Sequence, residues 1–271
     1  MKTFKLILVC FFVSTFAFAG VSSNEKEALL AIYNSTQGEQ WNTTWDLNSP
    51  IETWYGITVV DGKVVEINLP FNNLQGVLPQ EIGDLVYLKI FNVGFNNLVG
   101  TLPVTIGNLK DLSILELFMN NFEGEIPNEI GSLDNLEVLR LYSNSFTGEI
   151  PYSIGNLVNL KEVMLGSNFL TGTIPTEIVM LSQLQKLSLI DNKLSGDIPA
   201  ELGHLVLLEE LVLSSNKFTG DVPMEFMNLN KLTTLMLSDN NLNEDYISVI
   251  NNTPNYIQLQ LSKSSIVVDR D

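Results

Sequence analysis

The sequence repeats itself every 24 residues from Val64 to Ser264, and this period limits what the chain can fold into. Its plainest copy is LKEVMLGSNFLTGTIP at residues 160–175. One apolar position recurs through nine periods, as Leu69, Val93, Leu117, Leu141, Leu165, Leu189, Leu213, Leu237 and Leu261. An Asn follows three residues later in all but the last, where Ser264 stands: Asn72, Asn96, Asn120, Asn144, Asn168, Asn192, Asn216 and Asn240. Such columns predict a solenoid, in which each coil buries its apolar side chains only against its neighbours.

Each column of the repeat has a physical reason. The L-x-L alternation predicts a short strand with one buried face. The Asn follows the strand, where its side chain can bond backbone groups that the turn leaves unpaired, so stacked copies predict an interior ladder. The Gly that comes next permits a bend, and the Pro after it favours a second extended segment. We therefore predict an α/β repeat solenoid with a parallel sheet.

The phrase L-x-G-x-I-P, as in Leu170–Pro175, resembles the plant-type subclass of the leucine-rich repeat family. The resemblance covers residues 64–264, which hold about nine repeats of 24 residues. It implies a right-handed superhelix with a parallel β-sheet on the concave face. It also implies a role in binding, mostly of proteins, peptides or glycans, on that face.

Residues 1–19 read as a secretory signal peptide. Lys2 and Lys5 precede an apolar run, and Ala17-Phe18-Ala19 supplies a small-residue cleavage site. The run is too short to be a spanning helix. A lipid anchor on Cys10 is the alternative, and Val9 before it disfavours that reading. We expect an exported protein, extracellular or at the cell surface, whose mature chain does not insert into a membrane.

Cysteine content and charge exclude several classes of function. Cys10 is the only cysteine, so disulfides, thiol catalysis and cysteine metal sites are not expected in the mature chain. Exported plant-type repeat proteins usually carry cysteine pairs in their caps, and this chain resembles their cysteine-free secreted relatives instead. A net charge of −17 disfavours nucleic acid and anionic membranes as partners. The charge serves solubility, or alternatively a cationic partner or bound divalent cations.

Residues 20–63 are predicted to cap the solenoid. Ser23 or Asn24 is expected to cap a helix whose apolar face is Ala28, Leu29, Ile32 and Tyr33. All three tryptophans follow, as Trp41, Trp45 and Trp54. A carbohydrate-stacking site is one interpretation, but we favour a cover for the open edge of the first coil. Thr58–Val60 and Val64–Leu69, around Asp61-Gly62, predict a hairpin.

The other end of the chain is less regular. After Asn240 the Gly and Pro columns stop, as is common in terminal repeats. Residues 265–271 form a tail, and SSIVVDRD is expected to supply a last edge strand. Either the chain is a complete small binding protein or it is a fragment of a longer one.

Residues that flank the buried strand positions are expected to point to the concave face. In the first repeats these residues are large and aromatic, whereas later repeats carry small polar ones. Aromatic side chains around an Arg are typical of binding hot spots. The predicted ligand site comprises Phe118, Tyr142, Arg140, Glu116, Phe95, Met119, Phe71, Asn92 and Met164. The alternative for Phe71, Phe95 and Met119 is that they tuck under the turn as part of the core.

A catalytic function is not expected. The single His204 falls on a variable position of the outer limb, and no second His completes a metal site. Carboxylates are plentiful, but nothing places two of them in a walled pocket. Glu125 and Glu149 are stacked like charges that could share a cation. The hydroxyl column at Thr147, Thr171, Ser195 and Thr219 raises an ice-binding interpretation, although it belongs to the repeat consensus.

From the sequence we predict an exported, monomeric, non-enzymatic recognition module without cofactor or metal. It would bind a protein, peptide or glycan on the concave face. A structural or adhesive cell-surface protein is the main alternative. An inhibitor of a secreted glycan-degrading enzyme is a narrower version of the first hypothesis, suggested only by the resemblance.

Overall fold

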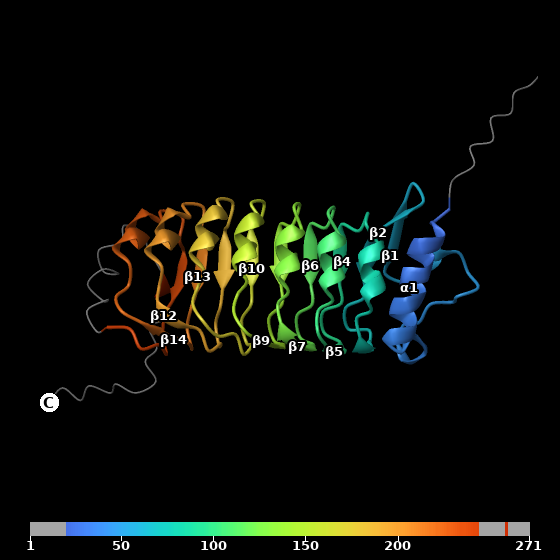
Figure 1. The fold of residues 1–271 in the computed structure, drawn as a ribbon, viewed down its shortest axis with the longest axis horizontal. Coiled ribbons are helices and arrows are strands. Elements are labelled where there is room, and N and C mark those ends of the chain that lie inside the picture. Colours follow the sequence, from blue (N-terminus) through green and yellow to red (C-terminus); the bar gives the residue numbers. More distant parts are fainter. Residues whose placement is uncertain (1–19, 244–257, 260–271) are drawn as a thin grey trace, which may run out of the picture.

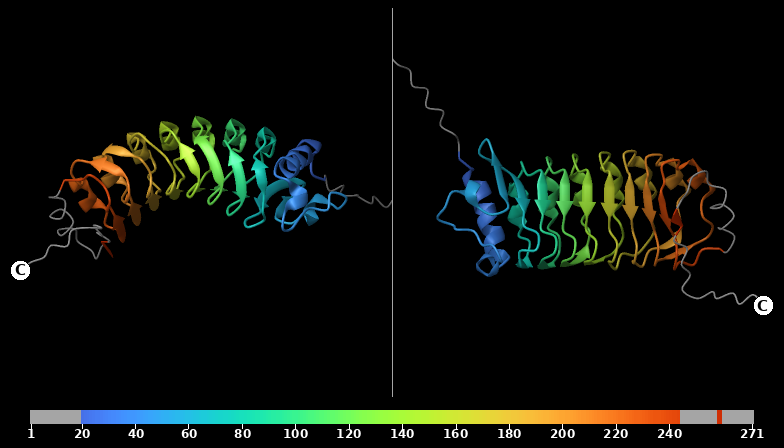
Figure 2. Two further views of the ribbon diagram at one scale, coloured as in Figure 1. Left: turned by 90° about the horizontal axis from the view of Figure 1, so that it is seen from below. Right: turned by 180° about the vertical axis from the view of Figure 1, so that it is seen from behind.

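The computed structural model describes residues 20–243 and 258–259, which form a solenoid of stacked coils (Figure 1). A ten-stranded sheet runs the length of the coil in the order β1-β2-β4-β6-β8-β10-β11-β13-β15-β16. In the left view of Figure 2, turned by 90° from Figure 1, the solenoid is an arc whose outer side carries the short helices. The strands are β1 (Ile57–Val60), β2 (Lys63–Asn68), β4 (Ile90–Asn92), β6 (Ile114–Glu116), β8 (Val138–Arg140), β10 (Glu162–Met164), β11 (Lys186–Ser188), β13 (Glu210–Val212), β15 (Thr234–Met236) and β16 (Gln258–Leu259).

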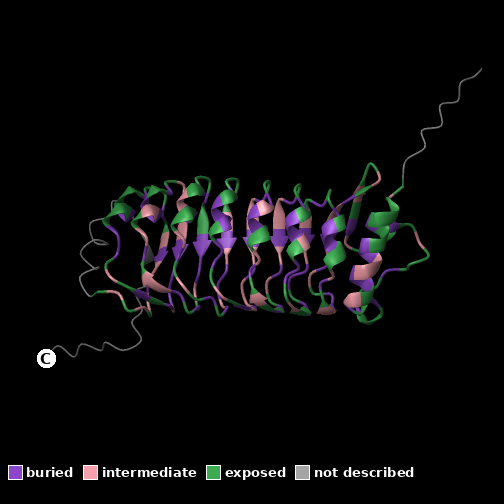
Figure 3. Ribbon diagram, in the orientation of Figure 1, coloured by how far each residue is buried: buried purple, intermediate pink, exposed green. Residues whose placement is uncertain are grey.

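The register of the sheet confirms the 24-residue period. Glu116 in β6 pairs with Arg140 in β8, and Arg140 pairs with Met164 in β10, in parallel. The L-x-L positions point inward, so that Leu139 and Leu141 are buried. The strands β4, β6, β8 and β10 of the main sheet carry only buried and half-buried residues, and many exposed residues lie in the loops and on the outer helices (Figure 3).

The predicted asparagine ladder is present along the interior. At Asn144 the side-chain Oδ1 accepts a hydrogen bond from the backbone N–H of Phe122 at 3.0 Å. Its Nδ2 donates to the carbonyls of Leu117 and Leu141, both at 3.0 Å. One amide group thus joins two adjacent coils, and it satisfies backbone groups that would otherwise be buried without partners.

Two further layers complete each coil. Beside the main sheet lie a four-stranded sheet and a two-stranded one, built from β3 (Gln75–Val77), β5 (Asn97–Gly100), β7 (Asn121–Glu125) and β9 (Ser145–Thr147), and from β12 (Ser195–Asp197) and β14 (Lys217–Thr219). The return limbs are 3-10 helices, each preceded by the Pro of the repeat. They are η3 (Gln80–Asp84), η4 (Val104–Asn108), η5 (Asn128–Ser132), η6 (Tyr152–Asn156), η7 (Thr176–Met180), η8 (Ala200–His204) and η9 (Met224–Asn228). Successive helices approach closely: a Cβ on Gly131 would lie 2.4 Å from the carbonyl oxygen of Ser153.

The N-terminal helix α1 (Ser23–Ser35) begins one residue earlier than predicted. Its N-cap is Ser22, and neither Ser23 nor Asn24 caps it. The reason is a capping box, in which Glu25 stands three residues after Ser22 and the two residues exchange hydrogen bonds. Glu25 is itself buried and accepts a bond from the N–H of Val64 at 2.9 Å, which ties the helix to the first coil.

The three tryptophans pack into the N-terminal end of the core. Trp41, Trp45 and Trp54 are all buried. Trp45 is at the centre, stacked on Trp54 at 4.7 Å and edge-on to Trp41 at 4.9 Å between ring centroids. Two 3-10 turns, η1 (Gly38–Gln40) and η2 (Ile51–Thr53), shape this segment. The rings are therefore packed against one another and are not presented as an open sugar-binding platform.

The predicted hairpin is also confirmed. β1 and β2 pair antiparallel, and Asp61 and Gly62 at the turn both have positive φ, at 51° and 72°. The predicted signal peptide, the ninth strand's Leu261 and the last edge strand lie outside the described residues. Within the described ranges no helix is both long and apolar enough to cross a bilayer.

Candidate functional site

A polar stripe runs across the first repeats on the concave face. Asn68, Asn92, Glu116, Arg140 and Met164 occupy equivalent positions and pair in register from β2 to β10. All five are half-buried. The strand alternation that buries their neighbours therefore places these residues, all but Asn68 of the predicted site, side by side on the open surface.

A continuous row of rings lies beside this stripe, formed by Phe71, Phe95, Phe118 and Tyr142, here called the aromatic row. Phe71 stacks on Phe95 with centroids 4.0 Å apart, and Phe118 stacks on Tyr142 at 4.9 Å. Phe95 meets Phe118 edge-on at 5.5 Å, which joins the two pairs. The contacts of Phe118 with Phe95 and Tyr142 have the separations of favourable aromatic pairs, and the Phe71–Phe95 stack is closer still. The structure thus brings the predicted aromatic residues into one surface.

The alternative that Phe71, Phe95 and Met119 belong to the core is wrong. Phe71 is 62% exposed, and Phe95 and Met119 are each 39% exposed. The turn after each strand carries these side chains outward, because the interior space beneath it is already filled by the asparagine ladder. The three residues remain candidates for contact with a ligand.

Gly94 gives Phe118 its place in the row. A Cβ on Gly94 would lie 2.6 Å from Cζ of the Phe118 ring. The ring therefore leans toward the preceding repeat, over a position that lacks a side chain. Nothing in the column of variable residues indicates this packing, because it depends on the direction in which the ring leans.

Three residues of the predicted site have an unfavourable backbone conformation. Phe71, Phe95 and Met119 have φ values of 56°, 53° and 52°, in the left-handed region. Later repeats place Ser or Asp at this turn position, as in Ser143 and Asp191. A bulky residue with positive φ costs roughly 1–2 kcal/mol relative to the right-handed conformation. The first three repeats therefore keep large apolar side chains outside the core despite this strain, which is typical of functional surfaces.

We expect the free energy of unfolding of the double variant Phe71→Asn/Phe95→Asn to lie within about 1 kcal/mol of the wild-type value. Asn tolerates the left-handed conformation, and this gain at two positions offsets the loss of two ring contacts, Phe71 with Phe95 and Phe95 with Phe118, at about 0.5–1.5 kcal/mol each. Urea denaturation followed by circular dichroism measures the difference. The matched control is Ser143→Asn/Ser167→Asn, at the same turn position. A loss above about 2 kcal/mol would show that the two rings are structural after all.

Three charged side chains form the centre of the site: Glu116, Arg140 and Glu162, here called the charge cluster. Arg140 donates from Nε and Nη2 to the two oxygens of Glu162, at 2.7 and 3.0 Å. Its Nη1 donates to Oε1 of Glu116. The bonds with Glu162, together with the charges of both carboxylates, outweigh desolvation and hold the pKa of Arg140 above its ordinary value. Burial raises the pKa of the neighbouring Tyr142.

Sequence reasoning missed Glu162 and the aliphatic row of Ile90, Ile114 and Val138. These residues occupy the outward position two residues before the polar stripe on the same strands, and all are half-buried. The period-two alternation that identified the stripe marks this column as well. The concave face of the first repeats therefore has a polar stripe between two apolar rows.

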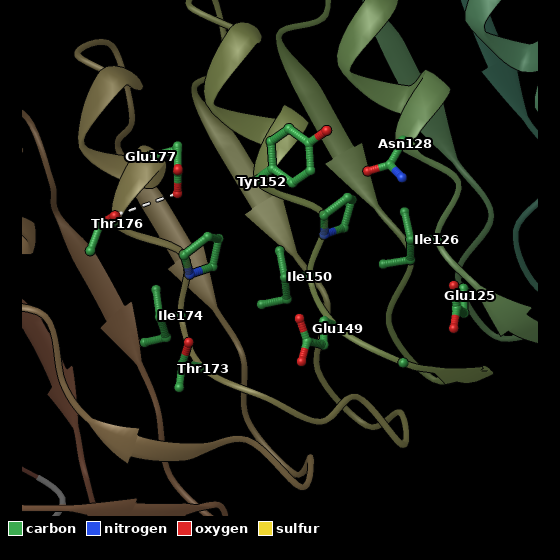
Figure 4. A pocket seen from close by; sticks show the side chains of 13 residues that line it. Glu125, Ile126, Asn128, Glu149, Ile150, Tyr152, Thr173, Ile174, Thr176 and Glu177 are labelled. Atoms are coloured by element: carbon green, nitrogen blue, oxygen red, sulfur yellow. Dashed lines mark hydrogen bonds between the residues drawn. The ribbon is translucent and has the colours of Figure 1, made fainter.

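A groove on the flank of the coil is distinct from this face (Figure 4). It has a volume of about 660 Å³ and crosses the loops before η5, η6 and η7. Glu125 and Glu149 lie along one side of it, and Tyr152 lies toward the 3-10 helices. Within the described part of the chain, no three His, Cys, Asp or Glu side chains gather closely enough to hold a metal ion. His204 is exposed on η8, as predicted.

The hydroxyl column considered for ice binding is interrupted by charge. Thr219 donates to the carboxylate of Asp197 at 2.8 Å, and acidic side chains occupy the adjacent column on the same flank. A regular array of free hydroxyls is therefore not what this surface presents.

The chain belongs to the leucine-rich repeat family, since residues 115–262 match the family profile described as a leucine-rich repeat region. No curated protein sequence matches it. Among solved structures it is similar to the leucine-rich repeat ectodomain of the receptor kinase GASSHO1/SCHENGEN3 from Arabidopsis thaliana, in complex with CASPARIAN STRIP INTEGRITY FACTOR 2. The identity is 34%, over 86% of this chain and 29% of that one, with a TM-score of 0.78.

Two further structures are similar over large parts of the chain. The Arabidopsis receptor kinase HAESA, in complex with the peptide hormone IDA and the co-receptor SERK1, is 40% identical over 66% of this chain and 32% of that one (TM-score 0.63). A plant ice-binding protein is 25% identical over 82% of this chain and 88% of that one (TM-score 0.65). The chain thus spans about a third or less of the two receptor ectodomains.

Proposed function

We propose that this protein is an exported recognition module that binds a protein or peptide on the concave face of its first five repeats. The observation that carries the proposal is the continuity of the aromatic row with the charge cluster on one open sheet. The solved HAESA structure, which is similar in sequence, is a complex with a peptide hormone, and this supports a peptide ligand here. The predicted signal sequence supports a ligand met outside the cell.

The physical case for binding rests on order that exists before the ligand arrives. The rings pack against one another, and Arg140 is held by two carboxylates. Binding therefore has to immobilise few side chains, each of which would cost about 0.5–1.5 kcal/mol. Aromatic and Arg side chains contribute most to binding energy at such surfaces.

A non-catalytic role fits the same geometry. The two groups whose pKa shifts at this site, Arg140 and Tyr142, both shift upward. Each therefore stays protonated near neutral pH, and neither is poised to act as a general base. The surface is open to water, which weakens the electrostatic effects that most enzymes use.

The test is capture of ligand by the mature protein (residues 20–271) and by its Phe118→Ala/Tyr142→Ala variant. We expect the double variant to lose at least about 30-fold in affinity, because truncating two central aromatic residues costs about 2 kcal/mol or more. Culture supernatant, cell-envelope extract and a glycan array serve as ligand sources, and retained species are identified by mass spectrometry or array position.

The matched control replaces two aromatic residues outside the concave face, Tyr152→Ala/Phe169→Ala, both of which are exposed. It should retain ligand as the wild type does. Equal capture by all three proteins would move the site elsewhere and favour the structural or adhesive alternative, with binding spread over the whole length. A retained glycan-degrading enzyme would favour the inhibitor hypothesis, and a retained glycan would contradict the choice of a peptide.

A further inference from the structure

The charge cluster limits the charge of a ligand that can bind at the site. Arg140 already donates hydrogen bonds from Nε, Nη1 and Nη2 to Glu116 and Glu162. An anionic group would have to displace one of these carboxylates, and the displaced carboxylate would then be left partly buried without its cation. The single cation at the centre of the patch is therefore a positioning group for the two acids.

One carboxylate oxygen of the charge cluster is not bonded to Arg140. Both oxygens of Glu162 are bonded to Arg140, but Glu116 uses only Oε1. Its second oxygen has no hydrogen-bond partner among the residues that the structure describes. The Glu116 side chain is only 12% exposed, so its charge is screened less than that of a surface carboxylate. With two acids and one base the cluster is negative, and the chain as a whole carries −17, which attracts cations.

The apolar surfaces on either side of the polar stripe limit the chemistry of the ligand. The rings stack in two pairs, so that each pair covers two ring faces, and Phe95 meets Phe118 edge-on. A sugar binds an aromatic residue by placing its C–H groups over an open ring face, and these contacts cover several of those faces. Ring edges and the row of Ile90, Ile114 and Val138 remain on either side of the stripe. These are surfaces for aliphatic and aromatic side chains of a polypeptide.

Building on the proposed function, we infer that the site binds a peptide segment that presents a Lys or Arg side chain to Glu116. Apolar side chains next to it in the ligand lie against the aromatic row. The basic group donates to the free oxygen of Glu116, while the neutral phenol of Tyr142 and the aliphatic row pack against the rest of the segment. Charge complementarity thus selects the ligand, and apolar contact supplies much of the affinity.

The experiment uses an array of synthetic eight-residue peptides and the labelled mature protein. The central residue is Lys, Arg, Ser, Asp or Glu, and the flanking residues vary among Leu, Phe, Ser and Gly. We expect peptides with central Lys or Arg and apolar neighbours to be retained at least about tenfold more than their Asp or Glu counterparts. Raising NaCl from 50 to 500 mM should reduce this preference, because a partly exposed pair is screened.

The variant Glu116→Gln tests the residue itself. Its amide oxygen still accepts from Arg140 Nη1, so the cluster stays in place while one negative charge is removed. We expect the best basic peptide to bind about tenfold more weakly and the preference for Lys over Ser to disappear. The matched control is Glu210→Gln in β13, on the same face and four repeats along, which should bind like the wild type.

The experiments distinguish failure of the basic-peptide inference from failure of the proposed function. Unchanged binding by Glu116→Gln, a preference for neutral or acidic peptides, or no peptide retained above the Glu116→Gln background would each overturn the inference. If Phe118→Ala/Tyr142→Ala nevertheless loses its natural ligand, the proposed function survives without it. If that double variant binds the selected peptides as the wild type does, the concave site itself is wrong.

Discussion

Replacing Trp45 by Ala is expected to lower the free energy of unfolding by about 4 kcal/mol, in the range typical of buried Trp truncations. Trp45 is buried at the centre of the cap, in ring contact with Tyr33, Trp41 and Trp54. Its indole N–H also donates to the carbonyl of Tyr55 at 2.8 Å, and that carbonyl would lose its partner. The cap closes the first coil, so its loss exposes apolar surface that no neighbouring repeat covers.

Urea denaturation measured by two probes tests this prediction. All three tryptophans lie in the cap, so fluorescence of the remaining Trp41 and Trp54 follows the cap, while circular dichroism follows the repeats. In a solenoid the two need not unfold together, and we expect the fluorescence transition of Trp45→Ala to precede the other. The control is Tyr55→Ala, an exposed aromatic residue of the same segment. A smaller effect for Trp45→Ala than for this control would contradict the cap.

The second large effect is expected for Asn144→Ala, with a loss of about 3 kcal/mol, because each buried polar group left without a partner costs about 1–3 kcal/mol. The backbone N–H of Phe122 loses its acceptor. The carbonyls of Leu117 and Leu141 each lose one of two donors, since Asn120 also donates to the first and Asn168 to the second. All of these groups are in the middle of the stack, where water cannot replace the side chain. The apolar area lost is small, so the effect would come almost entirely from hydrogen bonds.

Asn156→Ala provides the comparison, since Asn156 is exposed at the end of η6. It should change stability by no more than about 0.5 kcal/mol, as surface substitutions usually do. Thermal and urea unfolding of both variants, followed by circular dichroism, give the two values. If the two Asn→Ala changes have similar effects, the ladder does not contribute to stability in the way its geometry implies.

These two expectations also separate stability from recognition. Trp45 and Asn144 are interior residues whose loss weakens the coil. Phe118, Tyr142 and Glu116 face outward from the sheet, so we expect their replacement to affect ligand capture far more than unfolding. A protein in which both sets changed stability alike would have its concave aromatic row as a structural element only.

Much of the fold could be predicted because the repeat makes each local choice nine times. The alternation around Leu141, the Asn at position 144 and the turn at Asp61-Gly62 each have a local physical reason, and the structure confirms all three. The N-cap was misplaced because two neighbouring residues, Ser23 and Asn24, have the same intrinsic preference as Ser22. Only the reciprocal bond with Glu25 decides between them.

The candidate site was predicted only in part. Periodicity determines which residues face the same side, and so it placed Phe118 and Tyr142 in one column and Phe71 and Phe95 in the neighbouring one. It does not determine side-chain direction. That Phe118 leans over Gly94, and that Arg140 is held by Glu116 and Glu162, depends on contacts between strands 24 residues apart. The sequence alone thus determined the solenoid, its cap and its concave columns, because these follow from the short-range repeat pattern. Which groups of the site are already paired and which remain free is visible only in the folded chain, because pairing depends on rotamers that neighbouring repeats select together.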